Sequence, residues 1–192
     1  MFRDPLFHLI LQAIGCMVFV VFVGGTTGRY SFDTYSFTDF QWSGLSQVLS
    51  QTRPFAYPLL VASYRCISPD FHLFPQFQFI LFVGAVIFFY ESLKVYGFDK
   101  WTAFWAATPL FYQRYLLEWT TGILSDLPAL SMALVALGFL LRIVTRNGGV
   151  ANWAGLTLSL LLTYHTRAAY LFLIPLTPIL GFALLMFRES GS

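Results

Sequence analysis

The sequence predicts an all-α protein that lies in a membrane as a polytopic transmembrane helical bundle, with about five to six membrane segments and one short interfacial helix. Of its residues, 57% are hydrophobic and only 10% are charged. A chain with so few charged residues cannot cover the surface of a water-soluble globular protein with polar groups. Because one crossing takes about 20 apolar residues, a chain of 192 residues has room for few other structures. We therefore expect residues 1–192 to form a single integral membrane domain.

Six apolar runs along the chain are the candidate crossings. They cover approximately residues 6–23, 74–93, 101–112, 127–141, 153–164 and 170–187. The length of the first run favours a membrane anchor over a cleaved signal peptide. A seventh apolar stretch, residues 55–67, is too short to cross and ends at Ser68-Pro69-Asp70. It is typical of a re-entrant or interfacial helix.

Charge and cysteine content disfavour several classes of partner. The formal net charge is only +2 and the sequence contains no run of Lys or Arg. A surface that tracks nucleic acid needs such a run, so we expect no nucleic-acid partner. Cys16 and Cys66 give neither a metal-binding spacing nor a disulfide framework. We expect no metal and no cofactor.

The arginines and lysines fall into two sets if the N-terminus is cytoplasmic and all six runs cross. The inner set is Arg3, Lys94, Lys100, Arg142, Arg146 and Arg188, and the outer set is Arg29, Arg53, Arg65, Arg114 and Arg167. The two counts are nearly equal, so the positive-inside rule does not decide the orientation. The outer set holds only arginines, which suit bidentate contact with phosphate or carboxylate. This face is a candidate site; alternatively, the arginines reach out to lipid headgroups.

Four local patterns follow one another along the chain. They are an acid in SFDTYSF, then TRPFAYPLLVASYRCIS, LLEWTTGILSDLPALSMALVALGFLLR and LLTYHTRAAYLFLIPLTPIL. In this order they resemble the N-terminal half of the GT-C superfamily of polytopic glycosyltransferases, which includes protein mannosyltransferases and the aminoarabinose transferases of lipid A. Members of that family have a carboxylate in the first long outer loop and a basic residue before a Tyr-Pro-Leu-Leu-like helix. They also have a Ser/Thr-Asp-x-Pro sequence at the head of a later span.

The resemblance implies a catalytic role for Asp33 and a donor-binding role for Arg53. Asp33 matches the loop carboxylate that acts as general base on the acceptor hydroxyl, with Asp39 as a second candidate. Arg53 matches the basic residue that faces the phosphate of the donor, where a guanidinium stabilises the charge that builds up on the leaving group. A hydrated or capping aspartate and an arginine that reaches to lipid headgroups are the alternatives.

Three further residues are implied in substrate binding. We expect Tyr57 to anchor the short helix at the membrane interface, with Pro54 stiffening its start. Asp126 stands at a helix N-terminus, where it either caps the helix or orients a substrate. Arg167 is a candidate second contact to a phosphate or headgroup.

The chain also departs from the family. Thr52 stands where the aminoarabinose branch has an acid that can ligate a metal, so we expect no metal at that position. Family members usually continue for several more spans, whereas this sequence ends after one more crossing. Either the sequence is a piece of a longer protein, or a partner completes the site, or catalysis has been lost and the scaffold kept. We expect a complex with other membrane subunits, with a homo-oligomer as the alternative, through the aromatic faces of residues 74–90 or 170–187.

Two functions are consistent with these patterns. In the first, the chain is a GT-C-like glycosyltransferase module that transfers a sugar from a polyprenyl-phosphate donor to an extracytoplasmic acceptor. In the second, it is a non-catalytic accessory or scaffold subunit of a larger membrane complex. Membrane lipids are partners in both. The resemblance implies the bacterial inner membrane, with the site on the extracytoplasmic face.

Overall fold

The computed structural model describes residues 4–51, 54–113, 115–145 and 148–190, and in these residues the chain is helical without a β-strand. Its α-helices are α1 (Pro5–Phe19), α2 (Thr34–Thr38), α3 (Leu45–Ser50), α4 (Ala56–Arg65), α5 (Phe74–Tyr96), α6 (Lys100–Ala107), α7 (Leu116–Thr121), α8 (Asp126–Val144), α9 (Val150–Thr166) and α10 (Leu173–Ser190). A π-helical turn, η1 (Val20–Gly24), and two 3₁₀ turns, η2 (Thr108–Tyr112) and η3 (Ala168–Phe172), extend them. The all-α class is confirmed.

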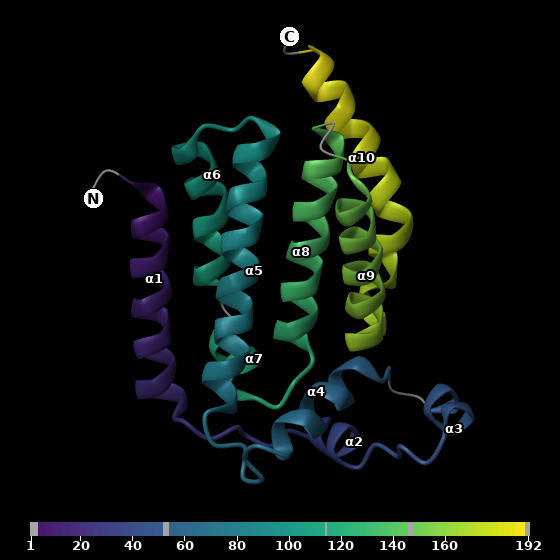
Figure 1. Ribbon diagram of the computed structural model, residues 1–192. Coiled ribbons are helices and arrows are strands. Elements are labelled where there is room, and N and C mark those ends of the chain that lie inside the picture. Colours follow the sequence, from purple (N-terminus) through teal and green to yellow (C-terminus); the bar gives the residue numbers. More distant parts are fainter. Residues whose placement is uncertain (1–3, 52–53, 114, 146–147, 191–192) are drawn as a thin grey trace.

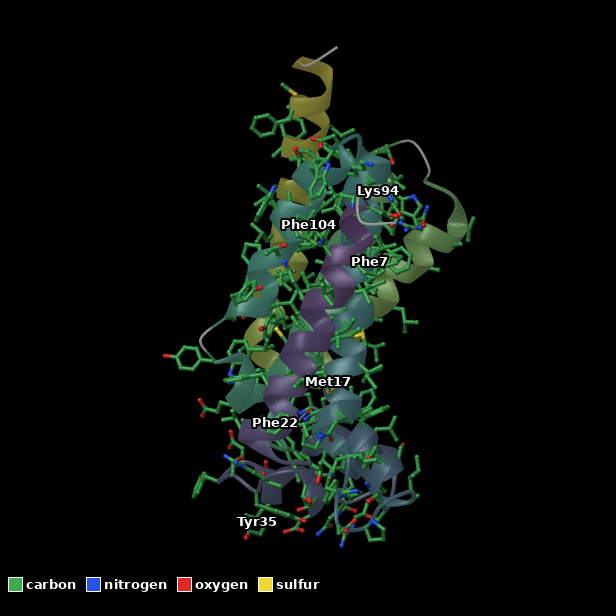
Figure 2. The ribbon with its side chains drawn as sticks, turned by 90° about the vertical axis from the view of Figure 1, so that its left-hand side faces the viewer. Phe7, Met17, Phe22, Tyr35, Lys94 and Phe104 are labelled. Atoms are coloured by element: carbon green, nitrogen blue, oxygen red, sulfur yellow. The ribbon has the colours of Figure 1, made fainter. Side chains whose placement is uncertain are left out.

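The long helices run up and down past one another in chain order (Figure 1). Segments α1, α6 with η2, and α9 run toward the end that carries α2, α3 and α4, and segments α5, α8 and α10 run away from it. We call this end the α2–α4 end. Figure 2 shows the same polarity from the side, with Tyr35 at the α2–α4 end and Lys94 toward the other.

Four helical stretches are long and apolar enough to cross a membrane: Pro5–Gly24, Phe74–Tyr96, Asp126–Val144 and Ala168–Phe187. Helix α9, of 17 residues, and the shorter α6 with η2 continue the alternation between them. The arrangement agrees with five to six membrane segments. The turns after α1, η2 and α9 lie at one end of the bundle. The sequence predicts this arrangement if all six apolar runs cross the membrane.

The short interfacial helix is α4, which begins and ends close to the expected residues 55–67. A tight turn follows it, in which the Ser68 hydroxyl and the backbone N–H of His72 donate to the Asp70 carboxylate, at 2.7 and 3.3 Å. These bonds lower the pKa of Asp70, the bond from Ser68 contributing most. Phe71 and Leu73 have positive φ angles of 57° and 62°. The turn thereby redirects the chain from α4 into α5.

The segment before α2 is bound to the rest of the chain through its backbone. Gly28 N–H donates to the Phe71 carbonyl at 3.1 Å, and Arg29 N–H donates to the Thr121 carbonyl at 2.8 Å. Leu73 N–H returns a bond of 2.7 Å to the Thr26 carbonyl. The beginning of the loop between the first two spans is therefore held against the bundle by backbone hydrogen bonds.

Helix α5 is the centre of the bundle. Phe79, Phe82 and Tyr90 on α5 are buried, in a cluster that also contains Leu127 and Leu134 of α8. The aromatic stretch 74–90, one of the two expected to contact partners, therefore supplies much of the protein's own core. The other stretch, 170–187, is different, because only 6% of the apolar span Ala168–Phe187 is buried, against 61% of Asp126–Val144.

Two glycines allow α8 to approach its neighbours. A Cβ atom on Gly138 of α8 would lie 2.7 Å from the Phe88 ring of α5, and one on Gly155 of α9 would overlap the Phe139 ring of α8. Real Cβ atoms do not come this close to other heavy atoms. The helices can therefore pack at this distance only because both positions lack a side chain.

We expect Gly138→Leu to destabilise the bundle by about 1–3 kcal/mol, because the added side chain must displace Phe88 from a packed interface. Thermal unfolding in detergent measures the effect. Gly84→Leu is the matched control, since a Cβ atom on Gly84 meets no atom within 4 Å. Equal stability of the two variants would contradict the close packing of α5 and α8.

The up-and-down arrangement predicts which residues share a side of the membrane. In a Cys66→Ser background, cysteines introduced at Thr38 and Gln113 should react with an impermeant thiol reagent from one side of sealed vesicles. A cysteine at Lys100 should react only from the other side. Labelling of all three from the same side would show that α5 does not cross.

Candidate functional site

An ion pair joins α8 to the turn between α9 and α10 at the α2–α4 end. The Nη1 group of Arg167 donates to Oδ2 of Asp126, the first residue of α8. The Asp126 side chain is 16% exposed and that of Arg167 is 38% exposed. Because α8 and α9 run antiparallel, the start of one helix lies beside the end of the other. Two residues that the sequence singled out separately therefore meet.

The ion pair bears on the two roles considered for Asp126. Ser125 is the N-cap residue of α8, but its side chain makes no capping bond. The Asp126 carboxylate lies in the first turn, where a negative charge is favoured by the helix dipole, and its observed side-chain partner is Arg167. The carboxylate therefore fixes the position of a guanidinium, and a partly buried pair of this kind holds its geometry better than an exposed one.

Asp33 lies at the same end, directly before α2. Its negative charge interacts electrostatically with that of Asp126. The neighbouring Thr34 positions it, because the Thr34 hydroxyl accepts a bond of 2.8 Å from Ser31 N–H and donates one of 3.3 Å to the Ile123 carbonyl. The second of these bonds fixes α2 to the segment that leads into α8. Asp33 makes no side-chain capping bond to α2.

Asp39, the second candidate base, is exposed beyond the end of α2, and its carboxylate accepts a bond of 3.2 Å from the Thr38 hydroxyl. Arg53 and Thr52 lie outside the described residues. Pro54, which follows them, lines a cavity of about 460 Å³. The other lining residues are Phe37, Ser125, Thr166, Arg167, Ala168 and Ala169. The cavity thus lies between α2, the segment before α4, the N-cap residue of α8, and the α9–α10 turn.

Tyr57 is fully buried beneath this region. Its hydroxyl donates to Oε1 of Gln78 at 3.1 Å, and Gln78 Nε2 donates to the carbonyls of Thr120 and Gly122 at 3.1 and 3.0 Å. The Tyr57 ring stands edge-on to Phe37, with centroids 4.7 Å apart. Burial and, to a smaller extent, the charge of Asp126 raise the pKa of Tyr57. The tyrosine therefore anchors α4 to the protein, not to the membrane interface as we expected, and it does not line the cavity.

Two residues that the sequence analysis did not single out help to build this end. Gln78 is a polar residue inside an apolar span, which by itself marks a position with a specific partner. Phe55 lies against His165, with ring centroids 4.5 Å apart, and so brings the start of α4 to the end of α9. That contact joins segments that are distant in sequence, so the residues around Phe55 or His165 do not predict it.

The described arginines of the predicted outer set, Arg29, Arg65 and Arg167, lie at separate positions. Arg167 pairs with Asp126, Arg29 lies beside η1 and α7, and Arg65 is exposed in the last turn of α4. Arg114, like Arg53, lies outside the described residues. In the described part of the chain, no three His, Cys, Asp or Glu side chains gather in a group that could hold a metal ion.

Comparisons of the chain with protein-family models, with curated proteins and with solved structures found no match. The resemblance to the GT-C superfamily therefore depends on the residues and their order alone. The geometry adds that four of the five residues selected for it, Asp33, Tyr57, Asp126 and Arg167, lie at the same end of the bundle.

Replacing Tyr57 by Phe should destabilise the protein by about 1–3 kcal/mol, because it leaves the buried Oε1 of Gln78 without its donor. Thermal unfolding in detergent reports the loss. Tyr35→Phe removes a hydroxyl from an exposed side chain at the same end and should leave the stability unchanged. A Tyr57→Phe variant as stable as the wild type would mean that the Tyr57–Gln78 bond contributes nothing to the fold.

Proposed function

We propose that this chain is a GT-C-like membrane glycosyltransferase module that transfers a sugar from a polyprenyl-phosphate donor to an acceptor at the α2–α4 end. The observation that carries the proposal is the ion pair of Asp126 with Arg167, which lines a cavity of about 460 Å³, together with the electrostatic interaction between Asp33 and Asp126. Carboxylates and a guanidinium are costly in a bundle this apolar, and such groups mark functional positions in membrane proteins.

Each residue has a defined role in the proposed reaction. The acceptor hydroxyl oxygen attacks the anomeric carbon of the sugar while the bond from that carbon to the phosphate oxygen breaks. The electron pair of that bond leaves with the phosphate, the configuration at the carbon inverts, and Asp33 takes the hydroxyl proton. Arg53 faces the leaving phosphate in this scheme, and Arg167 is the second guanidinium that stabilises its charge.

The partner of Arg167 supports this role. Asp126 holds one edge of the guanidinium, and a preorganised donor costs no reorientation when negative charge develops. The Asp126–Arg167 pair is neutral, and with Asp33 the three side chains carry one net negative charge, which by itself disfavours an approaching phosphate. Arg53 would neutralise that charge, so its positive charge is needed in the proposal before the negatively charged phosphodiester of the donor can bind.

The accessory-subunit function is the second candidate, and the exposure of α10 favours it. Phe182 and Phe187 are 67% and 74% exposed, so this helix presents rings to lipid or to another membrane subunit. In either case the proposed setting is a bacterial inner membrane, with the α2–α4 end extracytoplasmic.

The decisive variant is Asp33→Asn, which keeps the shape of the side chain but cannot accept the proton. Membranes containing the full chain are supplied with a panel of polyprenyl-phosphate sugars, and the release of polyprenyl phosphate is measured. We expect turnover to fall by about 100-fold or more, while donor binding persists. Asp39→Asn is the matched control and should remain active.

Measuring donor binding and sugar transfer together, in the wild type and in Arg167→Ala, separates the two candidate functions. A transferase should lose both donor binding and turnover, because the guanidinium contacts the phosphate. A wild-type chain that binds polyprenyl phosphate without ever transferring sugar would be an accessory subunit. A wild-type chain that binds no polyprenyl phosphate contradicts the glycosyltransferase proposal.

A further inference from the structure

On a different face from the cavity at Arg167, α1 and η2–α7 enclose an apolar groove of about 590 Å³. Gly15, Phe19 and Val20 line it on the α1 side, and Phe111 and Leu116 line it on the other. Toward the interior, the Thr108 hydroxyl donates to Oε1 of Gln12, a further lining residue, at 3.3 Å. The volume is within the range of about 300–1,000 Å³ that is typical of small-molecule pockets. Figure 2 views the bundle from the α1 side, with Met17 and Phe22 toward the α2–α4 end.

A smaller pocket of about 260 Å³ adjoins the same elements at the α2–α4 end, with charged and polar side chains beside Gly122 and Leu124. Arg29, Tyr30, Ser31, Glu118 and Thr121 contribute to its lining. The end of the first span connects the two spaces, because Phe19 and Val20 line the apolar groove and the Val23 carbonyl, about one turn later, accepts a hydrogen bond from Arg29, which lines the smaller pocket. Helix α7 lies beside both, with Leu116 at the groove and Glu118 at the pocket. The pocket thus lies where a headgroup would be if a hydrocarbon chain occupied the groove.

The backbone holds Arg29 rigidly in this pocket. Its N–H donates to the Thr121 carbonyl at 2.8 Å, and its carbonyl accepts from Ile123 N–H at 3.0 Å. Its Nη2 group donates to the Val23 carbonyl in η1 at 3.3 Å. The backbone of Arg29 is therefore fixed to α7, its guanidinium bonds to the end of the first span, and the Glu118 carboxylate of α7 lines the same pocket.

We propose that the groove and the pocket together bind one phospholipid with a zwitterionic phosphoethanolamine headgroup. One acyl chain fills the groove between α1 and η2–α7. The phosphate accepts hydrogen bonds from Arg29, and the ammonium group donates to Glu118. The charge pattern favours this headgroup, because one cation and one carboxylate match a phosphate and an ammonium, whereas a purely anionic lipid offers no cation to Glu118. The site shares no lining residue with the cavity at Arg167, so it does not depend on the proposed transferase activity.

The acyl-chain part of the proposal has a clean steric test. A Cβ atom on Gly15 meets no atom within 4 Å, so Gly15→Leu can be accommodated while its side chain occupies the groove. Gly84→Leu is the matched control, because Gly84 also has open space and does not line the groove. The headgroup part is tested by Arg29→Ala and Glu118→Gln, with Arg65→Ala as the control arginine at the same end.

Native mass spectrometry of the full chain measures the binding of phosphatidylethanolamine, phosphatidylcholine and phosphatidylglycerol with identical acyl chains. We expect the wild type to prefer phosphatidylethanolamine, since a trimethylammonium cannot donate a hydrogen bond to Glu118 and a glycerol headgroup carries no cation. Arg29→Ala and Glu118→Gln should each weaken that binding about fivefold, and Glu118→Gln should also reduce the discrimination against phosphatidylglycerol. Gly15→Leu should weaken the binding of all three lipids about tenfold.

Equal binding of the three lipids by the wild type would overturn the headgroup assignment. Unchanged binding by folded Gly15→Leu would overturn the groove as the acyl-chain site. If Gly15→Leu does not fold, the Arg29 and Glu118 variants decide alone, because both side chains are exposed and their removal leaves the core intact. Loss of binding in Gly84→Leu or Arg65→Ala would likewise contradict the proposed location.

Discussion

The side-chain amide of Gln78 holds together the end of the bundle on which the candidate site depends. It accepts from Tyr57 of α4 and donates to the carbonyls of Thr120 in α7 and Gly122 just after it, while its own helix, α5, is the centre of the core. A buried polar group without partners is costly in an apolar interior, so all three bonds favour a single arrangement. Helix α4, the head of α8 and the ion pair at Asp126 are positioned by this constraint.

The sequence predicted most of the fold because hydropathy is a local property. Apolar runs predict the membrane segments, and Ser68-Pro69-Asp70 predicts where the short helix stops. In the structure that helix ends at Arg65. The same reasoning failed for Tyr57. Tyrosines near apolar runs are enriched at membrane interfaces, but here a buried glutamine satisfies the hydroxyl, and that partner comes from a different helix.

The residues of the candidate site could be predicted from the sequence, but which of them contact each other could not. Asp126 and Arg167 stand out in the sequence for separate reasons, and their pairing follows only from the antiparallel packing of α8 and α9. The expected all-arginine face was too simple a description. Arg167 has a carboxylate partner and Arg29 lines a pocket with a carboxylate, so acidic residues divide the basic charge into separate positions. Charges distant in sequence can be matched only once the helices are packed.

The loose attachment of α10 has a consequence for how the molecule comes apart. The Tyr96 hydroxyl donates to the Leu184 carbonyl at 2.7 Å, and Pro178 interrupts the hydrogen-bond ladder within the helix. Helix α8, in contrast, is enclosed by α5 and α9. Stability is therefore graded across the bundle: α10 can detach by a local opening that costs few contacts, whereas α8 is released only when the whole domain unfolds.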